Sequence, residues 1–418
     1  MKQLNTTSAS SSLQDNETEE LATELADDAV EEQVLHKESL PGDNWNLKKS
    51  VKQRIESIVL GKCKLFDDWV EHIKLASESR AAYRKDRDTY PNDGEFYFSA
   101  DMQKVIMLPR LPGNKTALFT RRIIAFHETF APLVADAKTR AKWKDEGKVL
   151  PPKKPIGIIW HEGIQGRDDE DIASTFIKVL EHPRYRDAKS IVEWADNCAG
   201  QMKNGSFYCA LVAAVNKSFL DDITIKYFEK GHTFMSADAF HASVERNMRD
   251  LKKVMDFSDF KQCIEKTGES VEMRAEDFID FRKRLVAKTT KNADSIKYPL
   301  LADVAVVQFR KGSTKMYWKK RHTQDEFNES EFMLKKYREE VLKKPAYPLK
   351  SGPRGVNAEK KRDIISKIGP CMPESRLKFW RELIESDLAK DLTLNYDKPP
   401  KSKKADNKKG RRKHRGGT

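Results

Sequence analysis

The order of strand-like and helix-like segments between residues 95 and 255 limits this chain to an α/β fold. Three β-branched and aromatic runs come first: EFYFSADMQKVIML, RRIIAFHETFAPLV and KPIGIIWHEGI. Next come a helical segment, DDEDIASTFIKVLEHP, a strand, AKSIVEWADN, a buried helix, GSFYCALVAAVNKSF, a strand, DDITIKYFEKG, and a helix, SADAFHASVERNMRDLKKVM. Short apolar runs between turn residues predict strands, and apolar positions at helical spacing predict helices. We therefore predict a mixed five-stranded sheet flanked by helices.

Four carboxylates lie in or directly after the predicted strands and helices of this series. Asp101 is in the first strand, Asp196 ends the fourth strand, and Asp238 and Glu245 lie on the helix after the fifth. The segment order matches a ribonuclease H-like fold, in which these places meet at one end of the sheet. Crowded carboxylates repel one another unless hard cations lie between them. We predict catalytic roles for all four acids and a two-metal Mg²⁺ or Mn²⁺ site held by Asp101, Asp196 and Asp238, with the third acid open between Asp238 and Glu245.

Nearby polar residues are candidates for supporting the ligands. Asp196 and its neighbour could equally form an Asx-capped turn, and Asp238 could simply favour the helix dipole. Glu245 could be a solvated helix carboxylate, and a lone histidine is more often a hydrogen-bonding scaffold residue. The supporting candidates are Asn197, Gln201, His232 and His241.

Charge indicates the class of partner. The net charge of +13 and the pI of about 9.2 favour an anionic partner such as nucleic acid. We find no apolar run of 18 residues and no apolar segment after Met1, so we expect neither membrane insertion nor secretion. Five scattered cysteines fit reduced thiols and neither a disulfide framework nor a zinc finger.

The charges also divide the chain. We predict an acidic disordered tail (1–45), a helical N-terminal region (46–92) and the ribonuclease H-like core (93–290). A basic and aromatic strand-helix extension (291–345), a C-terminal helical unit (346–390) and a basic disordered tail (391–418) follow. The basic tail is typical of a nuclear import signal or a polyanion-binding arm, which predicts an import receptor as partner and a nuclear location.

The extension interleaves basic and aromatic side chains in the segment LLADVAVVQFRKGSTKMYWKKRHTQDEF. Such a surface can bind a phosphate backbone while its aromatic rings stack on bases. An ordinary amphipathic hairpin with a basic solvent face explains the same pattern. The candidate nucleic-acid-binding residues are Arg310, Lys311, Lys315, Tyr317, Trp318, Lys319, Lys320 and Arg321.

Four collinear blocks resemble a poorly characterised domain family of transposon-derived reading frames in animals and other eukaryotes: FSADMQKVIMLPRLP, WADNCAGQMKN, EKGHTFMSADAFHASVE and NAEKKRDIISKIGPCMPESRLKFW. The resemblance covers roughly residues 55–385. It implies a DDE-type transposase or integrase core that cleaves and joins DNA with metal ions. The chain departs from the family at Ala195, where Ser is usual, at Ala199, where Gly is usual, and at Met202, where Asn is usual, and it lacks the upstream Cys/His-rich region.

We therefore expect a transposon-derived, metal-dependent DNA nuclease or transposase. The alternatives are a catalytically inactive, domesticated nucleic-acid or chromatin-binding protein and a structure-specific nuclease unrelated to transposition. The sequence leaves open the target DNA sequence, the choice between DNA and RNA, and whether the protein is a homo-oligomer.

Overall fold

The computed structural model describes residues 64–198, 201–281, 299–344, 346–387, 389 and 391–392. The expected acidic tail (1–45), the first part of the expected N-terminal helical region (46–63) and nearly all of the expected basic tail (393–418) lie outside the described residues. Among the described helices, none combines the length and the apolar character needed to span a membrane.

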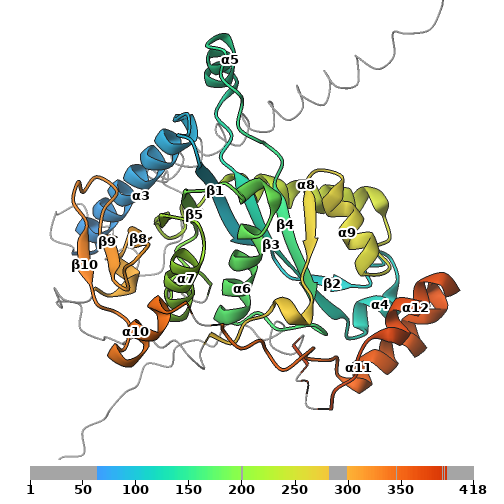
Figure 1. The fold of residues 1–418 in the computed structure, drawn as a ribbon. Helices are drawn as coiled ribbons and strands as arrows, with labels where there is room; N and C mark the ends of the chain where they lie inside the picture. The colour runs from blue at the N-terminus through green and yellow to red at the C-terminus, as the bar shows by residue number, and fades with distance from the viewer. Residues whose placement is uncertain are drawn as a thin grey trace, which may run out of the picture.

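A single mixed sheet of ten strands organises the described part of the chain (Figure 1). The five predicted strands are present, but the predicted number of strands was too low. β7 extends one edge, β8, β9 and β10 extend the other, and the short β2 pairs with β3. The strands are β1 (Glu95–Met102), β2 (Ile106–Leu108), β3 (Ile123–Pro132), β4 (Ile156–His161), β5 (Ser190–Ala195), β6 (Asp222–Tyr227), β7 (Glu269–Glu272), β8 (Val306–Arg310), β9 (Met316–Lys319) and β10 (Asn328–Ser330).

The strand order is β10-β9-β8-β6-β5-β1-β3-β4-β7. β1, β3 and β4 form an antiparallel meander, whereas β5 and β6 run parallel to β1. β8 pairs antiparallel with β6 and so covers an edge whose backbone groups would otherwise lack partners. The segment that we predicted as an extension therefore continues the central sheet.

Helices cover both faces of the sheet (Figure 1). α6 and α7 contact one face, and α8 and α9 contact the other. α5 lies on the connection between β3 and β4 and projects from the top of the molecule in this view. The helices are α3 (Lys64–Asp88), α4 (Lys115–Phe119), α5 (Ala137–Asp145), α6 (Asp169–Leu180), α7 (Gly205–Lys217), α8 (Ser236–Leu251), α9 (Phe257–Glu265), α10 (Lys335–Leu342), α11 (Ala358–Asp363) and α12 (Glu374–Glu382). Single 3-10 turns span Pro183–Tyr185, Ala275–Asp277, Leu301–Asp303 and Gly369–Cys371, and a π-helical turn spans Ile364–Ile368.

Alternation along β1 assigns its side chains to the two layers. Phe98, Ala100 and Met102 enter the core beneath α6 and α7. Successive strand residues face opposite sides, so Ser99 and Asp101 face α8. Ser99 confirms this, since its hydroxyl accepts a hydrogen bond from the backbone N–H of Ala237 at 3.0 Å.

The C-terminal helical unit packs onto the α8 and α9 side. Trp380 of α12 is fully buried in a cluster with Val244 of α8 and Phe260 of α9. A buried ion pair joins the unit to the loop after β4, because Nζ of Lys360 lies 2.6 Å from Oε1 of Glu162. Nζ of Lys360 also lies 2.6 Å from Oδ1 of Asp391.

Candidate metal centre

Pairing of β1 with β5 brings two predicted acids to one end of the sheet. Ala100 pairs with Ala195 in parallel register, so Asp101 and Asp196 follow matched positions on adjacent strands. On the other side of β1, Asp101 pairs with Thr129 of β3. Because the strand ends there, its carboxylate lies where side chains from the following loops and helices converge.

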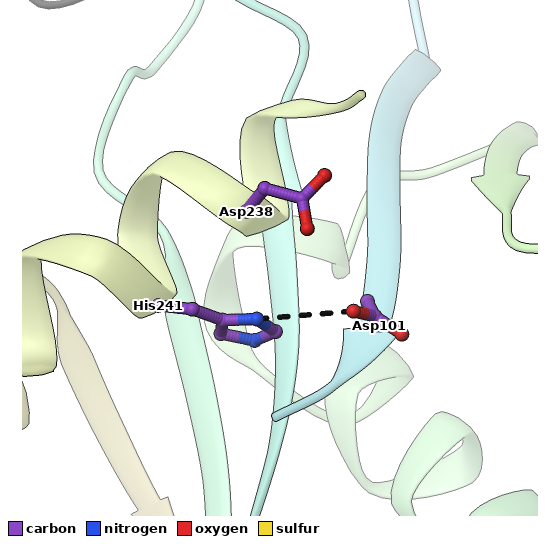
Figure 2. A group of neighbouring side chains, drawn as sticks. All are labelled: Asp101, Asp238 and His241. Carbon is purple, nitrogen blue, oxygen red and sulfur yellow. Dashed lines mark ion pairs between the residues drawn. The ribbon is translucent and has the colours of Figure 1, made fainter. Parts of the chain in front are cut away.

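Helix α8 brings a third carboxylate and a histidine to Asp101 (Figure 2). Asp238 and His241 are three residues apart, so they lie on the same side of the helix. Oδ2 of Asp238 accepts a hydrogen bond from the backbone N–H of Met235 at 3.0 Å, which fixes the carboxylate at the helix N-terminus. One ligand atom from each of Asp101, Asp238 and His241 lies within 4.8 Å of the others. Nδ1 of His241 is 3.8 Å from Oδ2 of Asp101.

Asp196, the other predicted metal ligand, is not a member of this group. Its Oδ1 accepts hydrogen bonds from the backbone N–H of Asn197 and the hydroxyl of Thr233, both at 2.7 Å. The hydrogen bond from Asn197 joins neighbouring residues within the predicted strand-to-helix turn. The negative charge of Asp196 nevertheless acts on Asp101 and Asp238, raising the pKa of each. The three predicted metal-binding acids therefore share one electrostatic environment.

Burial and like charges disfavour ionisation at this site. The pKa of Asp101 is raised to about 7, first by burial, then by Asp238 and, to a smaller extent, by Asp196. Burial also raises the pKa of Asp238 and lowers the pKa of His241 to about 4. Arg167, in the loop before α6, acts in the opposite direction on Asp101 and lowers its pKa. Carboxylate oxygens and an imidazole nitrogen in this arrangement suit a divalent cation, whose charge would remove the repulsion.

The structure separates Glu245 from the other acids. Its Oε2 accepts a hydrogen bond from the guanidinium of Arg110 at 2.9 Å, and the pair is partly exposed. Glu245 does not belong to the group formed by Asp101, Asp238 and His241. Two helical turns divide it from Asp238, and this distance along α8 is enough to direct it to another partner.

The remaining predicted supporting residues have different surroundings. Oδ1 of Asn197 accepts a hydrogen bond from Nζ of Lys203 at 2.8 Å, so the loop after β5 is fixed by a buried lysine. The backbone oxygen of Gln201 accepts a hydrogen bond from the side chain of Asn204. The ring of His232 lies 4.9 Å from the ring of His72 on α3. Of the two predicted histidines, His241 is the one that the structure places with the acids.

Several residues that contact the site were not predicted from the sequence. Gln103, His127 and Thr129 are buried and connect to His241 through hydrogen bonds. A signal was present, since three consecutive polar residues, His127, Glu128 and Thr129, interrupt the otherwise hydrophobic segment IIAFHETFAP. Polar side chains two residues apart on a buried strand share one face and require partners.

Residues 168–323 match the model of a family described as a domain of unknown function, DUF7869. This range contains Asp196, Asp238 and His241, whereas Asp101 precedes it. Neither the comparison with curated proteins nor that with solved structures finds a match.

The DUF7869 match also contains the hairpin of β8 and β9, where we predicted a nucleic-acid surface. Strand alternation places Arg310, Tyr317 and Lys319 on its outer face, while Trp318 enters the core. Trp318 is 5% exposed and donates its indole N–H to Ser330 at 2.9 Å. The prediction that Trp318 stacks on bases was therefore wrong, because the period of two buries every second residue.

Several predicted basic side chains have acidic partners within the protein. Arg321 forms ion pairs with Glu71 at 2.7 Å and Glu78 at 2.6 Å, both on α3. Nζ of Lys315 lies 2.7 Å from Oε1 of Glu329, and Nζ of Lys320 lies 3.9 Å from Oδ2 of Asp303. These contacts reduce the charge that the hairpin presents to a phosphate backbone.

Three other basic residues leave their charge on the surface. Arg310 and Lys311 are exposed. The guanidinium of Arg310 lies over the ring of Tyr317, 4.0 Å from its centroid, and Nζ of Lys319 lies 4.3 Å from the centroid of Phe327. Cation–π contacts hold such groups in place without neutralising them. Arg310, Lys311 and Lys319, with Tyr317, are therefore the remaining candidates for nucleic-acid contact.

Proposed function

We propose that this protein catalyses metal-dependent phosphodiester cleavage or strand transfer on DNA. The observation that carries the proposal is the convergence of Asp101, Asp196 and Asp238, from three separate segments, at one end of the sheet. Asp196 and Asp238 both raise the pKa of Asp101, so the three carboxylates act on one another. Groups of acids with perturbed pKa values are typical of functional sites.

The central strands support this proposal. The order β6-β5-β1-β3-β4 places the fifth, fourth, first, second and third core strands side by side. The first three core strands form an antiparallel meander, and the last two run parallel to the first. This strand order supports the proposal of a ribonuclease H-like core, as the resemblance to transposon-derived DDE-type domains implies.

The donor set fits Mg²⁺ or Mn²⁺. Asp101, Asp238 and His241 would hold one ion. Asp196, whose charge acts on Asp101 and Asp238, would contribute to holding a second. Bound metal ions would neutralise phosphate charge and lower the pKa of the attacking water or hydroxyl. Arg167 supplies a positive charge beside the acids and would orient a phosphate oxygen. Arg310, Lys311 and Lys319 would contact the DNA backbone farther from the reacting bond.

Two departures from the resembled family leave this site intact. Ala195 and Met202 are buried in the hydrophobic core, at 0% and 2% exposure, and neither supplies a donor or acceptor side chain to the acids. The third departure, Ala199, lies outside the described residues. A protein that binds DNA without cleaving it remains the alternative. With either function we propose a nuclear location, with the basic C-terminal residues recognised by an import receptor.

Cleavage of labelled single- and double-stranded DNA tests the proposal. We expect Mn²⁺-dependent products from the wild type, none with EDTA, and a rate at least about 100-fold lower for Asp101→Asn. Asp222→Asn is the matched control, because Asp222 is a half-buried strand carboxylate at the opposite end of β6. If the wild type and Asp101→Asn bind DNA equally and neither cuts it, the protein is a binding protein.

A further inference from the structure

A series of buried polar side chains leads to His241. Oε1 of Gln103 lies 2.7 Å from Nδ1 of His127, whose Nε2 lies 3.1 Å from Oγ1 of Thr129. The same Oγ1 lies 3.0 Å from Nε2 of His241. Gln103, His127 and Thr129 are 4%, 1% and 0% exposed. Because each hydrogen bond needs one donor and one acceptor, the direction of the first bond determines the direction of the others.

The amide of Gln103 sets that direction. Its Nε2 lies 3.4 Å from the backbone oxygen of His241 and donates to it, since the reverse orientation would place two oxygens against each other. Oε1 therefore accepts from Nδ1–H of His127. A neutral imidazole then offers Nε2 as an acceptor, and the hydroxyl of Thr129 donates to it. The oxygen of Thr129 in turn accepts from Nε2–H of His241.

The other ring nitrogen of His241, Nδ1, consequently carries a lone pair. It faces Asp101, with the carboxylate Oδ2 at 3.8 Å, and the backbone carbonyl of Asp101 lies within hydrogen-bonding reach of the ring, where it favours the protonated imidazole and raises the pKa of His241 against the larger lowering by burial. A lone pair facing oxygen acceptors is unfavourable unless a proton or a metal ion lies between them. A separation of 3.8 Å is too long for a hydrogen bond. It is within the span of about 4.2 Å available to two ligands that are each about 2.1 Å from one metal ion.

We propose that Nδ1 of His241 binds one transition-metal dication together with the carboxylates of Asp101 and Asp238, so that Mn²⁺ binds more tightly than Mg²⁺. Mg²⁺ prefers oxygen ligands, whereas a mixed imidazole and carboxylate set suits first-row transition metals. Thr129 is a positioning residue, because it holds His241 in the tautomer that binds metal. This inference rests on the proposed function, since it concerns the same site and specifies its metal.

Titration calorimetry of the full chain with Mn²⁺, and in parallel with Mg²⁺, tests the inference. We expect His241→Ala to weaken Mn²⁺ binding at least about 100-fold and Thr129→Val to weaken it about 10- to 100-fold. The weaker Mg²⁺ affinity should change little in His241→Ala. His182→Gln and Thr175→Val are matched controls on the opposite face of the sheet, and both should bind Mn²⁺ within twofold of the wild type. Circular dichroism checks that each variant folds.

Nitrogen NMR of the metal-free wild type gives an independent measurement. We expect the proton of His241 on Nε2 and not on Nδ1. A proton on Nδ1, or unchanged Mn²⁺ affinity in folded His241→Ala, overturns the inference. If His241→Ala does not fold, Thr129→Val and the tautomer of the wild type decide the question.

The two proposals fail in different ways. Mn²⁺ binding through His241 without DNA cleavage supports the metal site and contradicts the proposed function. DNA cleavage that survives His241→Ala but is lost in Asp101→Asn supports the function and contradicts the histidine ligand. If no divalent cation binds to the wild type, both proposals are wrong.

Discussion

Asp101 and His241 approach each other from a strand and a helix that lie far apart in sequence, with Oδ2 and Nδ1 3.8 Å apart. Asp238 joins them from the first turn of the same helix. The separation is too long for a direct hydrogen bond and suits two ligands of one ion. Metal affinity should therefore depend on the acids of this group and on the hydrogen-bonded side chains that hold His241 in place.

Two conservative substitutions on α8 test whether Asp238 or Glu245 is the third acid of the site. Asp238→Asn should lower Mn²⁺ affinity at least about 10-fold, because it removes a charged ligand beside Asp101. Glu245→Gln should leave the affinity unchanged, since its partner is Arg110. Its effect on stability should be below about 1 kcal/mol, as is usual for exposed pairs. Calorimetry and thermal unfolding measure both properties, and equal metal losses in the two variants would contradict the separation of the two acids.

Gly157 should be essential for the hydrogen-bonded series that ends at His241. A Cβ atom at this position would lie 2.5 Å from Nε2 of His127, which is closer than packed atoms can approach. We expect Gly157→Ala to lower the free energy of unfolding by about 1–3 kcal/mol and to weaken Mn²⁺ binding. Gly369→Ala is the control, because its added Cβ would meet nothing closer than Leu377 at 3.3 Å. If Gly157→Ala has the same stability and the same Mn²⁺ affinity as the wild type, the position of His127 does not affect metal binding.

Glu193 should make stability depend on pH. Its carboxylate is fully buried, its two oxygens lack hydrogen-bond partners within the described part of the chain, and burial raises its pKa well above the usual range. The folded state therefore binds a proton more tightly than the unfolded state. The resulting stability is complete below the unfolded pKa of about 4 and is lost as pH rises toward the folded pKa.

Glu193→Gln should flatten this dependence. We expect the variant to gain about 1 kcal/mol or more at pH 8 relative to the wild type and to gain less at pH 4. Denaturant unfolding at both pH values measures the difference. Glu181→Gln, at the exposed end of α6, is the control. A larger gain at pH 4 than at pH 8 would be the wrong sign and would contradict a raised pKa.

The outer face of the hairpin should contribute to DNA affinity through charge. Replacing Arg310, Lys311 and Lys319 with Gln should weaken binding of a DNA duplex. It should also reduce the slope of log affinity against log salt by about 0.9 for each phosphate that the protein no longer neutralises. Arg321→Gln should change the slope little, because Arg321 is paired with Glu71 and Glu78. Fluorescence anisotropy across a salt series measures both, and an equal slope change in Arg321→Gln would contradict this assignment.

Lys360 should anchor the C-terminal helical unit. Its ammonium group is fully buried and lies 2.6 Å from oxygens of both Glu162 and Asp391. Lys360→Met removes the 2.6 Å ammonium contact from both buried carboxylates, although Arg354 still lies 3.7 Å from Glu162 and Arg121 3.5 Å from Asp391. The loss should cost up to about 3–5 kcal/mol in the free energy of unfolding. The exposed Lys378→Met is the control. A cost below about 1 kcal/mol would show that the buried pair contributes little to stability.

Local pattern was enough to predict the central strands and helices. Period-two and helical spacing depend only on nearby residues, and so β1, β3, β4, β5 and β6 were all predicted from the sequence. The same local reasoning could not count the strands of the sheet. β7 pairs with β4 and β8 pairs with β6, which are distant in sequence, and these pairings depend on which sheet edges are left open. β9 and β10 then add to β8 as neighbours in sequence.

The candidate site, too, was predicted only in part from local sequence. The sequence determined which acids could act, because Asp101 and Asp196 interrupt or end apolar runs and Asp238 begins a helix. Only the tertiary structure separated Asp238 from Glu245, placed His241 beside Asp101 and moved Trp318 into the core. These outcomes depend on side-chain direction and on partners such as Arg110 and Thr129, which come from other strands and loops. Local sequence determines an element, and contacts between distant elements determine the surroundings of each side chain.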